Sequence, residues 1–228
     1  MAVTAGKPLY LPRTSSMARI IRSEIYIALD DIPYSRGTDV NRTPIKTTGG
    51  PAILTAPVHT GLGMPLHHVR LVTPAHWQRK HWRAIELSYR NAPYFEHYEE
   101  FLCETYACDW QFLVDLNLHL LAGLVTALGA STRILRASQL GVSGKGVPRL
   151  AALVKAVGGV AYLAEPSPAE TVQNTSVFAN AGIHFEVLRW HPPIYRQRFG
   201  EFAPDLSVLD LLMNCGPDAF RILRAASS

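Results

Sequence analysis

Two short apolar segments near the start of the chain constrain the fold more than any other feature. Residues 2–5 are typical of a first strand, and residues 24–29 (EIYIAL) are typical of a buried strand. The intervening pattern predicts a helix over about residues 15–23, capped by one of the two serines at its start. A strand, a helix and a second strand in this order form a βαβ unit, which favours a parallel sheet with a right-handed crossover.

The remainder of the chain is helical in the middle and alternates again at the end. Helices are expected at residues 75–91, 95–107, 110–129, 147–157, 169–181, 208–214 and up to about 224, and strands at 132–136, 160–163 and 183–188. Between the first unit and the helical middle, residues 43–48 and 51–58 predict a β-hairpin turning at Gly49-Gly50, and residues 66–72 predict a further extended piece.

This order of elements predicts one α/β domain over residues 1–228. We expect an open, mostly parallel, Rossmann-like sheet with a hairpin and a helical insertion at about residues 75–130. Apolar residues make up 48% of the chain and charged residues 18%, a balance that suits a globular core and argues against disorder.

The charge and the apolar segments exclude several classes of protein. The net charge is 22 − 18 = +4 with no run of five like charges, which is too dispersed for a dedicated duplex-DNA binder. Residues 113–130 are the most apolar stretch, but Asp115 and Asn117 interrupt it, so a core helix is expected rather than a membrane span. The N-terminus has no secretory pattern and the three cysteines form no C-x-x-C pair, which favours a cytoplasmic protein with reduced thiols.

Short motifs along nearly the whole chain, from about residue 7 to 224, resemble a known family. They include PLYLP at 8–12, LDDIPY at 29–34, KHWRAI at 80–85, HP at 191–192, FAPDLS at 202–207 and NCG at 214–216. In order and spacing they are similar to the WbqC-like family of bacterial O-antigen and natural-product gene clusters, and the resemblance implies small-molecule biosynthesis. The family's first loop usually has His-Gln-Pro, whereas this chain has Gly6-Lys7-Pro8, so Lys7 is a candidate replacement for the histidine.

Polar residues after the second strand are the first candidates for a site. Asp30 and Asp31 follow directly, where ligands of open α/β sheets bind, and paired carboxylates there can hold a cation or take a proton. The alternative is that they form a turn. Arg42 and Lys46 supply cations for a phosphate or carboxylate, or else make salt bridges.

The helix over 75–91 contributes Lys80, His81 and Arg83. His81 is a candidate general base because histidine titrates near neutrality, although a core-edge histidine bonded to a carbonyl is equally compatible with the pattern. Lys80 and Arg83 lie on a separate helix face and are candidates for phosphate binding. Tyr10 and Tyr34, which lie within the family-like motifs, complete the candidate substrate-binding set.

The last third of the chain supplies the other candidates. A glycine-rich segment, residues 141–146, precedes a helix and contains Lys145, with Arg149 one turn later, so an anion site is expected there, although the P-loop spacing is absent. His191 and Gln197 follow the last strand, and His191 is the preferred acid–base candidate. The histidines show no H-E-x-x-H or i, i+4 arrangement, so no metal site is predicted, and the sequence indicates no particular cofactor.

Three functions fit these patterns. The first is a transferase that moves an acyl or aminoacyl group onto an amine of a sugar or metabolite, using a nucleotide-linked or carrier-bound donor. The basic charge permits transfer RNA as the carrier. The second is an ATP-dependent nucleotidyl- or adenylyltransferase, and the third is a non-catalytic ligand-binding protein. No membrane partner is expected, and the sequence sets no oligomeric state.

Overall fold

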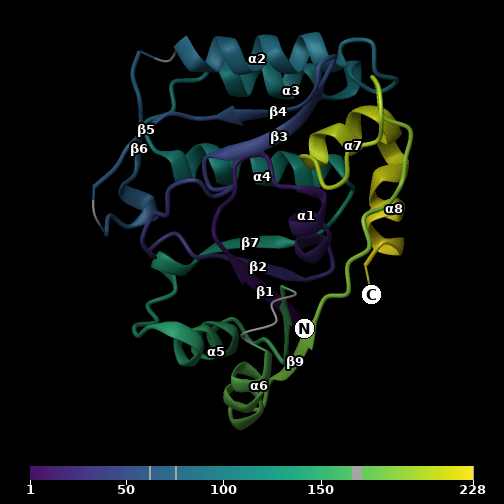
Figure 1. Ribbon diagram of the computed structural model, residues 1–228. Helices are drawn as coiled ribbons and strands as arrows, with labels where there is room; N and C mark the ends of the chain where they lie inside the picture. The colour runs from purple at the N-terminus through teal and green to yellow at the C-terminus, as the bar shows by residue number, and fades with distance from the viewer. Residues whose placement is uncertain (62, 75, 166–170, 228) are drawn as a thin grey trace.

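The computed structural model describes residues 1–61, 63–74, 76–165 and 171–227, and its centre is an open parallel sheet (Figure 1). The order of the five strands is β7-β2-β1-β8-β9, and every neighbouring pair is parallel. The strands are β1 (Ala2–Gly6), β2 (Ile25–Ala28), β7 (Arg133–Arg136), β8 (Ala161–Ala164) and β9 (His184–Val187). The predicted open, Rossmann-like sheet is therefore confirmed.

The side chains of the sheet divide between two apolar cores. Tyr26, Ala28 and Leu163 point into the larger core, which includes α1 (Thr14–Ile21). Val3 and Ile27 point into the smaller core, which is formed with α5 (Gly146–Ala156) and α6 (Thr171–Asn180). Because both faces are covered, the central strands β1, β2 and β8 are mostly apolar, which explains why the sequence shows continuous runs there instead of alternation. The edge strand β9 does alternate between exposed and partly buried residues. The expected start of α6 at residue 169 lies outside the described residues.

The segment between β2 and β7 forms a second layer above the larger core. It contains the hairpin β3 (Arg42–Thr47) and β4 (Gly50–Thr55), the short pair β5 (Val58–His59) and β6 (Arg70–Leu71), and the helices α2 (His76–Tyr89), α3 (Glu96–Ala107) and α4 (Leu113–Ala127). Figure 1 shows α2, α3 and the hairpin at the top and α4 between them and the sheet. The expected hairpin and helices are present.

Two details of this layer differ from the sequence prediction. Thr47 pairs with Gly50, so the turn residues are Thr48 and Gly49 instead of Gly49-Gly50. Residues 66–72 are not one strand, because a 3-10 turn, η1 (Leu66–His68), precedes the two-residue strand β6. The turn occurs where the backbone N–H of His67 bonds to the carbonyl of Asp30 at 2.8 Å, a long-range contact that local propensity does not report.

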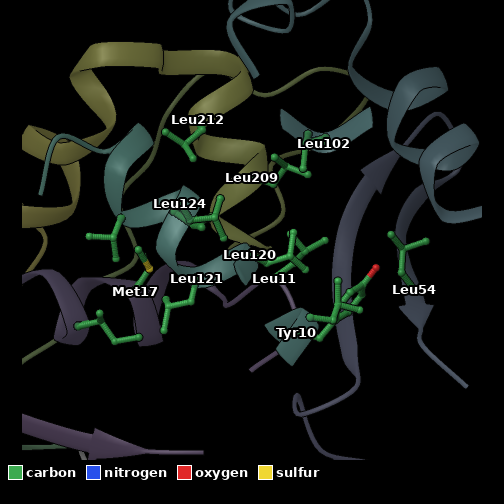
Figure 2. Close-up of a cluster of buried hydrophobic side chains, with 14 of the residues drawn as sticks. Tyr10, Leu11, Met17, Leu54, Leu102, Leu120, Leu121, Leu124, Leu209 and Leu212 are labelled. Carbon is green, nitrogen blue, oxygen red and sulfur yellow. The ribbon is translucent and has the colours of Figure 1, made fainter. Parts of the chain in front are cut away.

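The C-terminal helices close the larger core. They are α7 (Val208–Cys215), the 3-10 turn η3 (Gly216–Asp218) and α8 (Ala219–Ala225), and α7 and α8 pack against α1. Figure 2 shows Met17 of α1, Leu121 of α4 and Leu209 of α7 in one cluster of buried side chains. The apolar segment 113–130 is thus mostly a core helix, and no helix in the described ranges has the length and hydropathy needed to cross a membrane.

The N-terminus of α1 is capped by a residue far away in the sequence. The carboxylate of Asp205 accepts hydrogen bonds from the Ser15 backbone N–H at 2.8 Å, the Thr14 hydroxyl at 2.9 Å and the Ser15 hydroxyl at 3.0 Å. The expected serine cap was therefore wrong, since the residue at the capping position is Arg13, whose side chain does not cap. Ser207 caps α7, its hydroxyl oxygen accepting from the Leu209 N–H.

Replacing the long-range cap should destabilise the protein measurably. Asp205→Ala leaves three donors at the start of α1 without their acceptor, and we expect the free energy of unfolding to fall by about 1–2 kcal/mol. Asp205→Asn keeps an acceptor oxygen and tolerates the positive φ of 51° at this position, so its loss should stay within about 0.5 kcal/mol. Urea denaturation measures both. The exposed Asp218→Ala is the control, and equal losses in Asp205→Ala and Asp218→Ala would contradict the cap.

Candidate functional site

A buried carboxylate joins the carboxyl ends of β2 and β7. Asp30 follows β2 and is 0% exposed. Its Oδ2 accepts from Arg136 Nε at 2.8 Å and from the Ser138 hydroxyl at 2.7 Å, and its Oδ1 accepts from the Ser138 backbone N–H at 2.9 Å. Burial alone would raise the pKa of Asp30, but these hydrogen bonds outweigh burial and hold the pKa below its ordinary value. Asp30 is therefore an ionised group that is held in place by three hydrogen bonds.

The polar residues of the core helix α4 support the same edge. Asp115 accepts from Arg136 Nη1 at 3.0 Å, so Arg136 bridges two carboxylates. The amide of Asn117 is 0% exposed and donates to the carbonyls of Pro8 at 2.9 Å and Val40 at 2.7 Å. Buried polar groups need such partners, and of the two residues that interrupt the apolar helix, Asn117 holds the loops after β1 and β2 while Asp115 holds the end of β7.

A cavity of about 890 Å³ opens beside the end of β2, between residues 29–33 and the segment that leads into α5. We call it the edge pocket. Its charged lining residues are Asp31, predicted from the motif after β2, and Lys145 and Arg149, predicted together as an anion site. Arg149 grips Asp31 with both terminal nitrogens, Nη1 to Oδ1 at 3.1 Å and Nη2 to Oδ2. The structure thus brings together a carboxylate and two cations from distant parts of the chain.

The glycine-rich segment gives the edge pocket one of its walls. Gly141, Gly144 and Gly146 have φ values of 66°, 115° and 63°, a region in which other residues are strained. Lys145 is the N-cap residue of α5, and its side chain makes no capping hydrogen bond. The start of α5 therefore faces a cavity with its backbone donors and one lysine, an arrangement that attracts anions.

His81 and Tyr10 lie in the larger core and away from the sheet edge. Tyr10 is 0% exposed, and its hydroxyl bonds to His81 Nδ1 at 2.8 Å and to the Tyr106 hydroxyl. Burial lowers the pKa of His81 to about 4, although a backbone hydrogen bond with Thr55 opposes the shift. The imidazole is neutral at pH 7 and enclosed, which is the core-histidine alternative that the sequence left open.

Lys46 and Gln197 belong to a third location, around the buried carboxylate of Asp210. Tyr89 and Tyr195 donate to Asp210 at 3.0 and 2.7 Å, and Lys46 donates to the carbonyl of Glu201 close by. Gln197 bonds to the Tyr195 hydroxyl at 3.2 Å and to the backbone of Ala203. Burial raises the pKa of Asp210 despite the tyrosine hydrogen bonds. These residues fasten the segment before α7 to β3 and α2.

Tyr34 and Arg42 line a second cavity, of about 420 Å³, together with Arg36 and Asn41. The Tyr34 hydroxyl donates to Asn41 Oδ1 at 3.1 Å. The segment 29–37 lies between this cavity and the edge pocket, since its residues line both. Lys7, at the position of the family's histidine, reaches the same segment and donates to the Ser35 hydroxyl at 3.2 Å.

Three further candidates lie on the surface. Lys80 and Arg83 are exposed on α2, where Arg83 pairs with Glu86 at 2.8 Å. His191 is exposed after β9, and its backbone N–H bonds to the carbonyl of Ala226 at 3.0 Å. None of the three lies among the residues that line the edge pocket. The described residues also contain no group of three or more His, Cys, Asp or Glu side chains suited to a metal ion.

Sequence reasoning missed Arg136, Ser138 and Arg19. Arg136 ends a predicted strand, so the sequence could have placed it at the carboxyl edge of the sheet. Its partners could not be predicted, because they depend on β7 lying next to β2. Ser138 follows it in a 3-10 turn. Arg19 is 3% exposed on α1, and nothing in the helical pattern distinguishes it from a solvated residue.

The buried imidazole predicts a specific dependence of stability on pH. Because the folded pKa of His81 is about 4 and the unfolded value is 6.5, the unfolded chain takes up the proton first as the pH falls. His81 therefore contributes stability above pH 6.5 that is lost towards pH 4, on the order of 3 kcal/mol in full. The difference in unfolding free energy between wild type and His81→Gln should shrink by that amount, measured by urea denaturation across this range. Tyr10→Phe should keep the wild-type pH slope because burial is the main cause, and a constant difference for His81→Gln would contradict the assignment.

Comparison of the sequence with known proteins places the chain in a family. The sequence pattern of the WbqC-like protein family matches residues 7–222. The chain is also similar to a Mycobacterium tuberculosis protein described as uncharacterized protein Rv1507c, with 30% identity over 221 residues, 94% of each chain. The match starts at the loop after β1 and extends into α8, so it covers every element that forms the edge pocket. The chain belongs to the WbqC-like protein family.

Proposed function

We propose that this chain is a small-molecule transferase that holds the anionic part of its donor in the edge pocket. The observation that carries the proposal is the meeting of Asp31, Lys145 and Arg149 in one cavity at the carboxyl edge of a parallel sheet. Open α/β sheets bind their ligands at this edge. The WbqC-like resemblance, through its gene clusters, supports a role in biosynthesis, in which an acyl or aminoacyl group is transferred to an amine of a sugar or metabolite.

The charge of the edge pocket favours an anionic ligand. Asp31 and Arg149 neutralise each other through their two-pronged contact, which leaves the ammonium group of Lys145 and the N-terminal amides of α5. The pocket therefore carries an excess of one positive charge, and a phosphate or a nucleotide-linked group complements it. Lysine binds phosphate as a point charge, so Lys145 is assigned to binding rather than to proton transfer.

The rest of the lining suits the organic part of a donor. Leu29, Ile32, Val147, Leu150 and Leu153 form an aliphatic surface in the same cavity. Pockets for small molecules combine such a surface with a few placed polar groups. Asp31 is the acid–base candidate that lies in this pocket, and a substrate amine that displaced Arg149 would meet its carboxylate. His81 and His191, proposed from sequence, are a core side chain and a surface side chain.

A nucleotidyl- or adenylyltransferase is the second candidate, and the strand order favours it. Counted along the chain, the five strands of the sheet have the order 3-2-1-4-5, the arrangement of the mononucleotide-binding half of Rossmann-like sheets with one strand pair added. In this reading ATP occupies the edge pocket and Lys145 contacts its phosphates. The reading requires a dependence on ATP and magnesium that the acyl-transfer reading does not.

Ligand-dependent thermal unfolding separates these functions. Nucleotides with and without magnesium, nucleotide sugars and acyl or aminoacyl donors are tested at high concentration. A ligand at a hundredfold its dissociation constant stabilises by about 2.7 kcal/mol, which raises the midpoint by roughly 5–10 °C at this size. We expect a shift with one donor class and a loss of most of that shift in Lys145→Ala, because the single uncompensated cation is gone.

Lys80→Ala is the matched control, since Lys80 is an exposed lysine on α2 outside the edge pocket. It should retain the full shift. A shift with ATP and magnesium promotes the nucleotidyltransferase, and binding without turnover would indicate a ligand-binding protein. No shift with any class, or the same shift in Lys145→Ala as in wild type, would refute the edge pocket as the donor site.

A further inference from the structure

A second location at the carboxyl edge of the sheet contains buried N–H groups that have no hydrogen-bond partner. The strand order reverses between β1 and β8, because the chain runs outward from β1 through β2 to β7 and then returns to β8 and β9. Such a switch point is where open α/β sheets leave a crevice for ligands. Arg19 of α1 spans this point, donating to the carbonyl of Ala5 at 2.9 Å and pairing with Glu165 at 2.6 Å.

Arg19 is an unusual residue for such a place because its side chain is 3% exposed. A buried guanidinium needs a full set of acceptors. Its Nη1 donates to the Thr4 hydroxyl and the Ala5 carbonyl, and its Nη2 donates to the Glu165 carboxylate. Its buried Nε–H has no hydrogen-bond partner. Gly6, at the end of β1, keeps this arrangement open, since a Cβ there would lie 3.0 Å from Arg19 Nη2.

A second orphaned donor belongs to a residue that lines the same cavity as Arg19. The indole Nε1–H of Trp190, which follows β9, is buried and has no partner. Trp190 and Arg19 line a cavity of about 170 Å³ together with Ser15, Ser16, Glu165 and Leu188. We call it the switch cavity. A single water needs about 10–15 Å³ of such space, so the switch cavity admits a group larger than one water.

Both unsatisfied groups are donors, so the missing occupant is an acceptor. Buried N–H groups without partners are rare because each gives up its hydrogen bond to water and gains none in return. A cation is disfavoured beside a buried guanidinium. An oxyanion, a carboxylate or a phosphate, supplies acceptors for both donors and balances the charge of Arg19 where it displaces Glu165, and hydrogen bonds to charged acceptors are the stronger kind.

We propose that the switch cavity binds the oxyanion group of a small ligand through Arg19 and Trp190. In the free protein Glu165 balances the charge of Arg19 through Nη2 but leaves both orphaned donors without an acceptor. Its carboxylate pairs with Arg19 while the side chain is 62% exposed, so it exchanges for a ligand oxyanion at little cost. The switch cavity lies on the α1 side of the sheet and the edge pocket on the α5 side, which makes this a second site, independent of the proposed donor site.

Calorimetric titration with inorganic phosphate, repeated with acetate, tests the switch cavity at constant ionic strength in the full-length chain. The titrations use Lys145→Ala as the background, which removes the cation of the edge pocket. Two variants should then change the phosphate affinity in opposite directions. Trp190→Phe removes one donor to a charged acceptor and should weaken binding about tenfold. Glu165→Gln removes the competing carboxylate and should tighten binding about two- to fivefold.

Each variant has a matched control elsewhere in the chain. Trp110→Phe removes an indole N–H whose acceptor is the Thr105 carbonyl, and Glu86→Gln removes a carboxylate that pairs with Arg83, so neither should change the affinity. Both test variants keep the contacts of Arg19 with β1, and circular dichroism checks their fold. Acetate binding with the same pattern identifies a carboxylate group, and binding of phosphate alone identifies a phosphoryl group.

The outcomes separate the two sites. Phosphate binding that the wild-type chain shows and Lys145→Ala abolishes would overturn the switch cavity and support the edge pocket. Binding that persists in Lys145→Ala but responds to neither Trp190→Phe nor Glu165→Gln would also overturn the switch cavity. Binding that persists in Lys145→Ala and responds with opposite signs to the two variants supports the switch cavity whatever happens at the edge pocket. Absence of any phosphate or acetate binding would leave water as the occupant and overturn the proposal.

Discussion

The carboxylate of Asp30 is the interaction on which the rest of the candidate site depends. It is buried at the end of β2 and accepts three hydrogen bonds from Arg136 and Ser138 at the end of β7. A buried ionised group needs hydrogen-bond donors around it, and these three donors strongly constrain the geometry of Asp30. Asp31, the next residue, is thereby held against Arg149 in the lining of the edge pocket.

The second layer fixes the same loop from the other side. The carbonyl of Asp30 accepts from the backbone and ring nitrogens of His67, and Ile32 accepts from the Leu66 N–H at 3.0 Å. The insertion between β2 and β7 therefore does more than cover the larger core, because its 3-10 turn holds one wall of the edge pocket. Pre-organised polar groups of this kind lower the cost of ordering a site when a ligand binds.

Local patterns predicted the parallel sheet and the helices because continuous apolar runs and helical periodicity are properties of short segments. The sequence identified Asp31, Lys145 and Arg149 as candidates but did not predict that they line one cavity, because their proximity depends on the strand order. His81 and Tyr10 show the limit of local patterns. Both were candidates for the site, but their side chains are buried in the larger core, where they share a hydrogen bond of 2.8 Å. Asp205 shows another, because it caps a helix about 190 residues earlier, beyond the reach of any local capping rule.

Hydrogen exchange tests most directly whether the buried carboxylate organises the edge pocket. Asp30→Asn places an amide N–H₂ where an oxygen accepted from Arg136 or Ser138, so two donors oppose each other at the junction of β2 and β7. The account predicts faster amide exchange in residues 137–149 and little change in α7 and α8. Asp115→Asn, which alters the exposed side of the same arginine, should leave residues 137–149 close to wild type. Unchanged exchange of residues 137–149 in Asp30→Asn would contradict the account.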